Sequence, residues 1–154
     1  MKTKLLSIMI ILSCLFSSFP VHAENTHSSQ TENDSYTWCF TLGAQDQKAI
    51  VHGHDGNEIT LYVSSGVSGE KLIKASSMRL SVQFYIYAAN DIIVSAYNKS
   101  YSSNYYTILN DLLSVTSQSE AKYTLSCKKN LFTFTKYLKV SNQNSSLIVT
   151  SNIQ

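Results

Sequence analysis

Hydrophobic and polar residues alternate along much of the chain beyond residue 35, which is the pattern of strands with one buried face. In the first such segment, Tyr36, Trp38 and Phe40 fall on one face. Gly66 and Gly69 mark a loop. We predict strands around these apolar positions, at residues 36–40, 49–51, 59–63, 79–88, 91–97, 122–127, 132–140 and 146–151. Turn residues separate several of them, at Asp55-Gly56, Ala89-Asn90 and residues 142–144.

One segment, residues 103–118, departs from this alternation. Its apolar face recurs at spacings of three and four, which is typical of an amphipathic helix, and Ser102 or Ser103 is placed to cap its N-terminus. The residues of that face are Tyr105, Ile108, Leu109, Leu112, Val115 and Thr116. The sequence therefore predicts a mainly β domain with one amphipathic helix, an α+β fold. Either an open antiparallel sheet or a small closed barrel, such as an oligonucleotide/oligosaccharide-binding (OB) barrel, fits this pattern.

The N-terminus has the form of an export signal. Lys2 and Lys4 precede an apolar run over residues 5–16, and Ala23 offers a small residue for cleavage. The apolar run is shorter than the roughly 20 residues that a membrane span requires. We predict that residues 1–23 are a signal peptide and that the protein is periplasmic or secreted.

A competing interpretation is lipoprotein cleavage before Cys14, for which Leu12 is a poor fit. After the signal, residues 24–35 contain no apolar side chain, which predicts a disordered tail. The remainder, residues 36–154, is long enough for a single β-rich domain.

Charge argues against two classes of partner. Two of the twelve basic residues, Lys2 and Lys4, lie in the signal, so the remaining basic residues balance the ten acidic ones. Arg79 is the single arginine. A neutral chain offers no electrostatic footprint for nucleic acid or an anionic membrane, and we expect neither nucleic-acid binding nor membrane insertion.

Two cysteines, Cys39 and Cys127, follow the signal. An even pair in an exported domain predicts a disulfide between them.

Evidence for catalysis is weak. His52 and His54, with Asp55 or Glu58, could hold zinc as in a small envelope hydrolase, but histidines at a polar hairpin tip are more often exposed turn residues. There is no Gly-x-Ser-x-Gly elbow and no glycine loop of the phosphate-binding kind. We expect no enzyme, no metal and no cofactor.

A tyrosine-rich segment is the better functional clue. Aromatic rings stack on sugars while amides and hydroxyls bond to them, and the same mixture suits a protein partner. The alternative is a tyrosine-lined edge of the core. The predicted binding residues are Tyr97, Lys99, Tyr101, Asn104, Tyr105 and Tyr106.

The order of elements over residues 78–154 resembles the B subunits of bacterial toxins that carry an enzyme on a ring of five binding subunits, the heat-labile enterotoxin group. Residues 93–96 leading into the predicted helix, the strand that follows, and the closing segment 144–151 carry the resemblance. It implies an OB barrel that assembles into a homo-oligomer and binds host glycans.

We therefore predict an exported, non-enzymatic binding protein, in its narrowest form a glycan-binding toxin B-type subunit. The alternative is a periplasmic immunity or inhibitor protein that neutralises a bacteriocin or a cell-wall hydrolase. An inhibitor of this size can be monomeric, whereas a ring subunit is stabilised by its neighbours.

Overall fold

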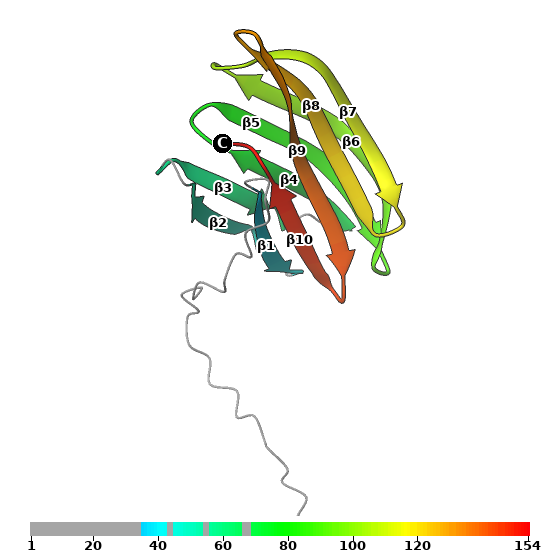
Figure 1. The fold of residues 1–154 in the computed structure, drawn as a ribbon. Coiled ribbons are helices and arrows are strands. Elements are labelled where there is room, and N and C mark those ends of the chain that lie inside the picture. The colour runs from blue at the N-terminus through cyan, green and yellow to red at the C-terminus, as the bar shows by residue number, and fades with distance from the viewer. Residues whose placement is uncertain (1–34, 43–44, 54–55, 66–68) are drawn as a thin grey trace, which may run out of the picture.

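The computed structural model describes residues 35–42, 45–53, 56–65 and 69–154, which form two antiparallel sheets of five strands each (Figure 1). The predicted signal peptide and nearly all of the predicted tail lie outside these residues. Sheet A contains, in spatial order, β1 (Tyr36–Thr41), β10 (Ser146–Ser151), β9 (Phe132–Gln143), β8 (Glu120–Lys129) and β7 (Thr107–Ser117). Sheet B contains β2 (Gln47–His52), β3 (Glu58–Val63), β4 (Glu70–Ser76), β5 (Leu80–Ala89) and β6 (Ile92–Ser103).

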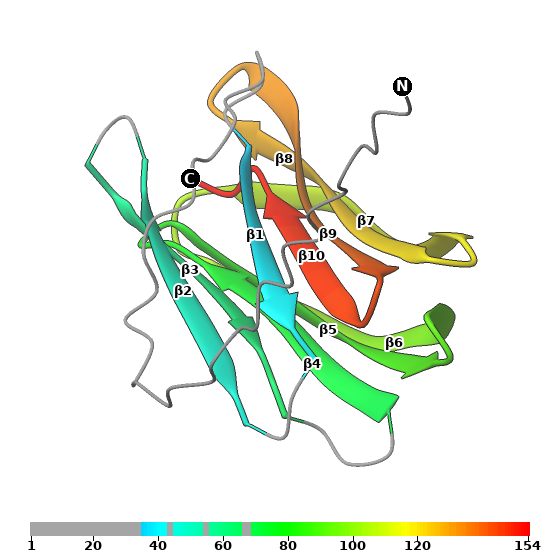
Figure 2. The same cartoon turned by 90° about the horizontal axis from the view of Figure 1, so that it is seen from below.

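The two sheets lie face to face as the layers of a sandwich (Figure 2). Strands that follow one another in sequence are neighbours, from β2 to β6 in sheet B and from β7 to β10 in sheet A. β1 completes sheet A by pairing with β10, in a register that places Tyr36 opposite Ser151. The fold is thus a mainly β sandwich, and of the two predicted forms the closed barrel is wrong.

The inner faces of both sheets supply the core. Ile59, Phe84, Tyr123 and Leu125 are fully buried. Phe84 of sheet B meets Tyr123 of sheet A edge to face, with ring centroids 6.2 Å apart. Because side chains alternate along a strand, every second residue of these strands reaches this core, and the rest form the two outer faces.

The helix predicted over residues 103–118 is wrong, because this segment forms the end of β6, a short link and strand β7. The pairing of β7 with β8 shifts register between Ile108 and Asn110 and again near Val115. Each shift marks a β-bulge, which adds one residue to a strand and lengthens the spacing of its inward positions from two to three. The apolar residues of the predicted helix face are divided in this strand, since Ile108 packs against the core whereas Leu109 and Leu112 are exposed. None of the described residues forms a helix long and apolar enough to cross a membrane.

Strand β4 was not predicted from the sequence. Lys71 points inward in this strand and is largely buried, while Leu72 lies on the outer face. This placement reverses the usual distribution of charged and apolar side chains and hides the alternation of the strand.

Candidate functional site

The tyrosines of β6 that were predicted to share one surface lie on opposite faces of sheet B. Tyr97 pairs with Tyr85 on the outer face, whereas Tyr101 pairs with the buried Val82 on the inner side. Residues four apart on a regular strand share a face, but β6 carries a bulge at Asn98, whose φ is 51°. The bulge therefore divides the predicted cluster.

Tyr97 belongs instead to an aromatic surface on the outer face of sheet B. Its ring stacks on Tyr85 with centroids 6.0 Å apart and an angle of 20° between the rings. Its hydroxyl donates to the Glu70 carboxylate, and this bond raises the pKa of Tyr97. The pair is half-buried and anchored at one hydroxyl.

A third tyrosine on the same face, Tyr62, is anchored in the same way. Its hydroxyl donates to Asp46 Oδ2 over 2.6 Å, and the Ser65 amide donates to Asp46 Oδ1 over 2.7 Å. These bonds lower the pKa of Asp46, and the bond to Asp46 raises that of Tyr62. Stabilised carboxylate acceptors thus hold two of the tyrosines.

Strand pairing places further side chains beside these rings. Lys74 lies opposite both Tyr62 and Gln83, and Leu72 lies opposite Tyr85. We call this surface the tyrosine face and define it as Tyr62, Leu72, Lys74, Gln83, Tyr85 and Tyr97. It combines ring surface with amide, ammonium and hydroxyl groups, and the carboxylates of Asp46 and Glu70 lie beside two of its tyrosine hydroxyls. Together these groups can stack on an apolar sugar face and bond to its hydroxyls.

Lys99 serves a different purpose from the one predicted. Its Nζ lies 3.0 Å from Asp111 Oδ2 of β7 and donates to the Asp111 carbonyl over 3.1 Å. The hydroxyl of Tyr123 donates to the same carboxylate over 2.7 Å. Tyr123 and Lys99 together hold the pKa of Asp111 below its usual value. This network joins the edge strands β6 and β7 and so connects the two sheets.

Asn104, Tyr105 and Tyr106 form the link between β6 and β7. Ser103 Oγ accepts from the amides of Tyr105 and Tyr106 over 3.3 and 2.9 Å, so the predicted helix cap instead orders this link. Tyr106 is half-buried, packs edge to face on Phe134 at 5.2 Å and donates to the Gln154 carbonyl. Asn104 and Tyr105 are exposed. Tyr105 and Tyr106 thus lie in contact at one end of the sandwich, away from Tyr97.

The predicted disulfide is not formed, and Cys39 and Cys127 are both free thiols. Cys39 lies on β1 and Cys127 on β8, with β10 and β9 between them. Strand neighbours are about 4.8 Å apart, so three intervals exceed the roughly 7 Å limit between bonded cysteine Cα atoms. The side chains also differ in exposure, since Cys39 is exposed and Cys127 is buried.

The histidine hairpin is described only in part. His52 is exposed at the end of β2, opposite Glu58, whereas His54 and Asp55 lie outside the described residues. Among the described residues, no three His, Cys, Asp or Glu side chains are grouped closely enough to hold a metal ion.

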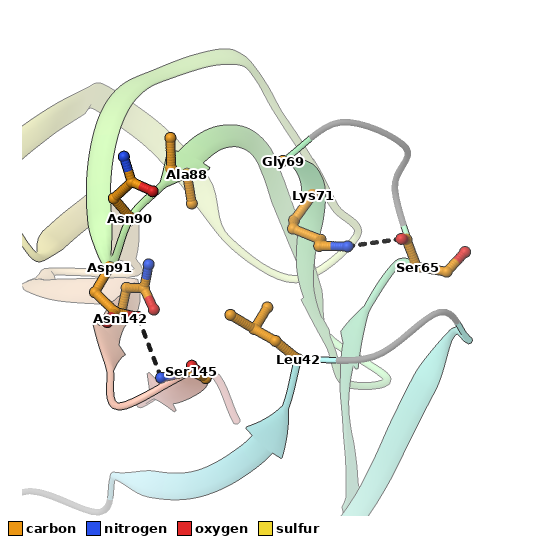
Figure 3. A pocket seen from close by; sticks show the side chains of 10 residues that line it. Leu42, Ser65, Gly69, Lys71, Ala88, Asn90, Asp91, Asn142 and Ser145 are labelled. Atoms are coloured by element: carbon orange, nitrogen blue, oxygen red, sulfur yellow. Dashed lines mark hydrogen bonds between the residues drawn. The ribbon is translucent and has the colours of Figure 1, made fainter.

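A cavity of about 530 Å³ lies at the end of the sandwich opposite the β6–β7 link and was not predicted from the sequence (Figure 3). Lys71 Nζ donates to the Ser65 carbonyl over 2.6 Å, and the Ser145 amide donates to Asp91 Oδ1 over 3.2 Å. The buried Oδ1 of Asn142 has no hydrogen-bond partner. The sequence carries little signal for this cavity, because its lining comes from several separate turns and strands and because strand β4, which carries Lys71, was not recognised.

Comparisons with known proteins do not assign the chain to a family. No family model and no curated protein matches it. A solved structure that it resembles is that of a hypothetical protein from Listeria monocytogenes EGD-e, with 26% sequence identity over 71% of this chain and 98% of that chain. The TM-score is 0.43, which supports no inference about fold or function.

Proposed function

We propose that the protein is an exported, non-enzymatic binding protein that recognises a neutral glycan through the tyrosine face. The observation that carries this proposal is the stacked pair of Tyr85 and Tyr97 on an open sheet surface, with the Tyr97 hydroxyl fixed on Glu70. The segment at residues 1–23 supports export.

Rigidity favours recognition by this face. The three tyrosines stand on strands β3, β5 and β6, and hydrogen bonds to Asp46 and Glu70 fix two of them. Side chains that are ordered before binding lose little conformational entropy when a ligand arrives. Tyrosine is well suited to this role because a rigid ring supplies a large contact area.

The polar groups of the face suit a sugar. Gln83 provides an amide and Lys74 an ammonium beside the rings, while Asp46 and Glu70 provide carboxylate acceptors. Charges of both signs are present, so the face does not favour a strongly charged ligand. A neutral sugar offers both an apolar ring face and hydroxyl groups to such a surface.

A toxin B-type subunit is the narrowest form of this proposal. The helix that contributed to that resemblance is strand β7, and the fold is a sandwich. The proposal therefore rests on the tyrosine face and not on the resemblance.

The test is a glycan array probed with the exported form of the protein, followed by titration calorimetry with each glycan retained. Tyr85→Ala and Tyr97→Ala should each weaken binding by about fivefold or more, since truncating an anchoring aromatic typically costs 1 kcal/mol or more. The matched control is Tyr137→Ala, which removes a half-buried tyrosine from sheet A and should bind as the wild type does.

Failure to bind any glycan, or an equal loss in Tyr137→Ala, would overturn the proposal. If no glycan binds but a bacteriocin or cell-wall hydrolase is bound and Tyr97→Ala weakens that complex, the immunity-protein alternative takes its place.

A further inference from the structure

Large apolar side chains are exposed on the turns at one end of the sandwich. Leu131 is 93% exposed in the turn between β8 and β9, and Phe132 beside it is 75% exposed. Met78, in the turn between β4 and β5, is also 75% exposed. Figure 1 shows the turn between β8 and β9 at the same end as the link between β6 and β7.

Basic side chains accompany these apolar tips and meet on one ring. The guanidinium of Arg79 lies 5.0 Å from the centroid of Tyr105, and the Nζ of Lys129 lies 3.7 Å from it. Arg79 precedes β5 of sheet B and Lys129 ends β8 of sheet A, so Tyr105 joins the turns of both sheets. We call this surface the basic aromatic end and define it as Met78, Arg79, Tyr105, Lys128, Lys129, Leu131 and Phe132.

A series of aromatic contacts supports this end from the core. Phe134 packs on the buried core and meets Tyr106 edge to face at 5.2 Å. Tyr106 in turn meets Tyr105 edge to face at 4.9 Å. The exposed ring is therefore held in place, and the cations next to it are positioned before any ligand arrives.

Most of the described acidic side chains lie away from this end. Asp111 is paired with Lys99 in the middle of β7. Glu120 is paired with Lys139 and is the first residue of β8, at the end of that strand away from Lys129. Glu58 begins β3 at the same end of sheet B, beside the end of β4, and is two strands from β5. Although the whole chain is nearly neutral, the fold therefore gathers positive charge around the exposed apolar tips.

Turns at the opposite end lack this character. The turn between β5 and β6 is formed by Asn90 and Asp91, and the turn between β9 and β10 by Asn144 and Ser145. Turns between strands thus do not require apolar residues in this fold. Leu131, Phe132 and Met78 are exposed beside basic residues. This end of the sandwich therefore suits a partner that has a negatively charged surface with an apolar layer beneath it.

We propose that the basic aromatic end docks onto the surface of an anionic lipid bilayer. Leu131, Phe132 and Met78 enter the boundary between headgroups and acyl chains, where apolar side chains leave water. Tyr105 lies at the headgroup level, which aromatic rings with a polar tip prefer. Arg79, Lys128 and Lys129 face the lipid phosphates. The protein adsorbs to the bilayer without spanning it, and this activity is independent of glycan binding.

The test is co-sedimentation of the exported form with vesicles of phosphatidylcholine, with and without phosphatidylglycerol. We expect binding that requires phosphatidylglycerol and weakens as salt is added. Lys128→Gln with Lys129→Gln should lower the partition coefficient roughly 25-fold, because each basic residue near an anionic surface contributes about fivefold. Leu131→Ser with Phe132→Ser should lower it by about tenfold or more.

Matched controls remove the same chemistry from other surfaces. Lys48→Gln with Lys122→Gln removes two charges from the outer faces, and Ile50→Ser with Leu112→Ser removes two exposed apolar side chains. Both controls should keep wild-type partition. Melting temperatures of all variants establish that each is folded.

Absence of sedimentation with phosphatidylglycerol vesicles would overturn the proposal, as would controls that lose as much binding as the test variants. The proposal would also be overturned if the Leu131→Ser, Phe132→Ser variant kept the wild-type partition coefficient and the protein bound soluble heparin. That result would assign the surface to polyanions.

Discussion

The outer faces of the two sheets differ although their inner faces are alike. The outer face of sheet B carries four tyrosines, the three of the tyrosine face and the exposed Tyr87, and carboxylates anchor two of them. On sheet A the equivalent surface is composed mainly of threonine, serine and lysine, with Tyr137 under the Nζ of Lys122 at 4.6 Å. Two sheets with the same architecture and a shared core therefore present different chemistry to solvent.

The fold determines the residues of the inner faces and leaves those of the outer faces free. The inner faces must be apolar, because the sheets are held together by burying them. No such constraint acts on the outer faces, where the hydroxyl-rich surface of sheet A shows that the fold does not require aromatic residues. The tyrosines of sheet B are thus a property of this chain rather than of its architecture, and we assign recognition to them.

The largest expected effect sharpens the distinction between inner and outer positions on one strand. Phe84→Ala should cost about 3–5 kcal/mol of unfolding free energy, because it leaves a cavity against Tyr123. Tyr85→Ala, on the next residue, should cost less than about 1.5 kcal/mol, because the side chain is only half-buried. Urea unfolding followed by circular dichroism measures both. Equal losses would show that the tyrosine face is part of the core.

A second pair of variants tests how the border of the tyrosine face is built. Gly69 has a φ of 83°, and a Cβ there would lie 2.3 Å from the Ala88 carbonyl oxygen. Gly56 has a similar φ of 76° with open space around it. Gly56→Ala should cost about 1 kcal/mol through backbone strain alone, and Gly69→Ala at least about 2 kcal/mol because the clash adds to it. Equal costs in denaturant unfolding would contradict this close approach of β4 to β5.

Most strands could be predicted from the sequence, because alternation follows directly from a half-buried sheet. The bulges could not be predicted, since an extra residue in a strand is specified by pairing with its neighbour. One bulge in β6 placed Tyr97 and Tyr101 on opposite faces, and the helix-like spacing in the edge strand β7 includes Leu109 and Leu112, which are exposed. The disulfide failed for a related reason, because cysteine count carries no information about strand order.

A third prediction concerns the contact between the edges of the two sheets. Asp111→Asn removes the carboxylate that accepts from Tyr123 and pairs with Lys99, and should cost about 1 kcal/mol at neutral pH. The folded-state pKa of Asp111 lies below its unfolded value of about 3.9, so this stabilisation is present above that value. It is lost as the pH falls through the folded-state pKa.

Unfolding of wild type and Asp111→Asn at a series of pH values checks this. The difference between them should be constant near neutrality and should disappear in acid. A difference that grows toward acid pH would contradict the network.

The smallest expected effects concern the two faces of sheet A. Cys39 is exposed and should react with a thiol reagent in the folded protein, whereas Cys127 is buried and should react only after unfolding. Burial also raises the pKa of the Cys127 thiol, which slows its reaction further. Cys39→Ser should change the unfolding free energy by less than about 0.5 kcal/mol. Periplasmic protein whose intact mass shows a Cys39–Cys127 bond would contradict the strand order of sheet A.

An NMR titration with the glycan that the array identifies, observing the ring signals of all tyrosines, locates the binding surface directly. We expect concentration-dependent shifts of the Tyr62, Tyr85 and Tyr97 rings, while the ring of Tyr137 on sheet A stays unchanged. Shifts confined to Tyr137, or to the rings of Tyr105 and Tyr106 at the end of the sandwich, would contradict the assignment of recognition to the tyrosine face.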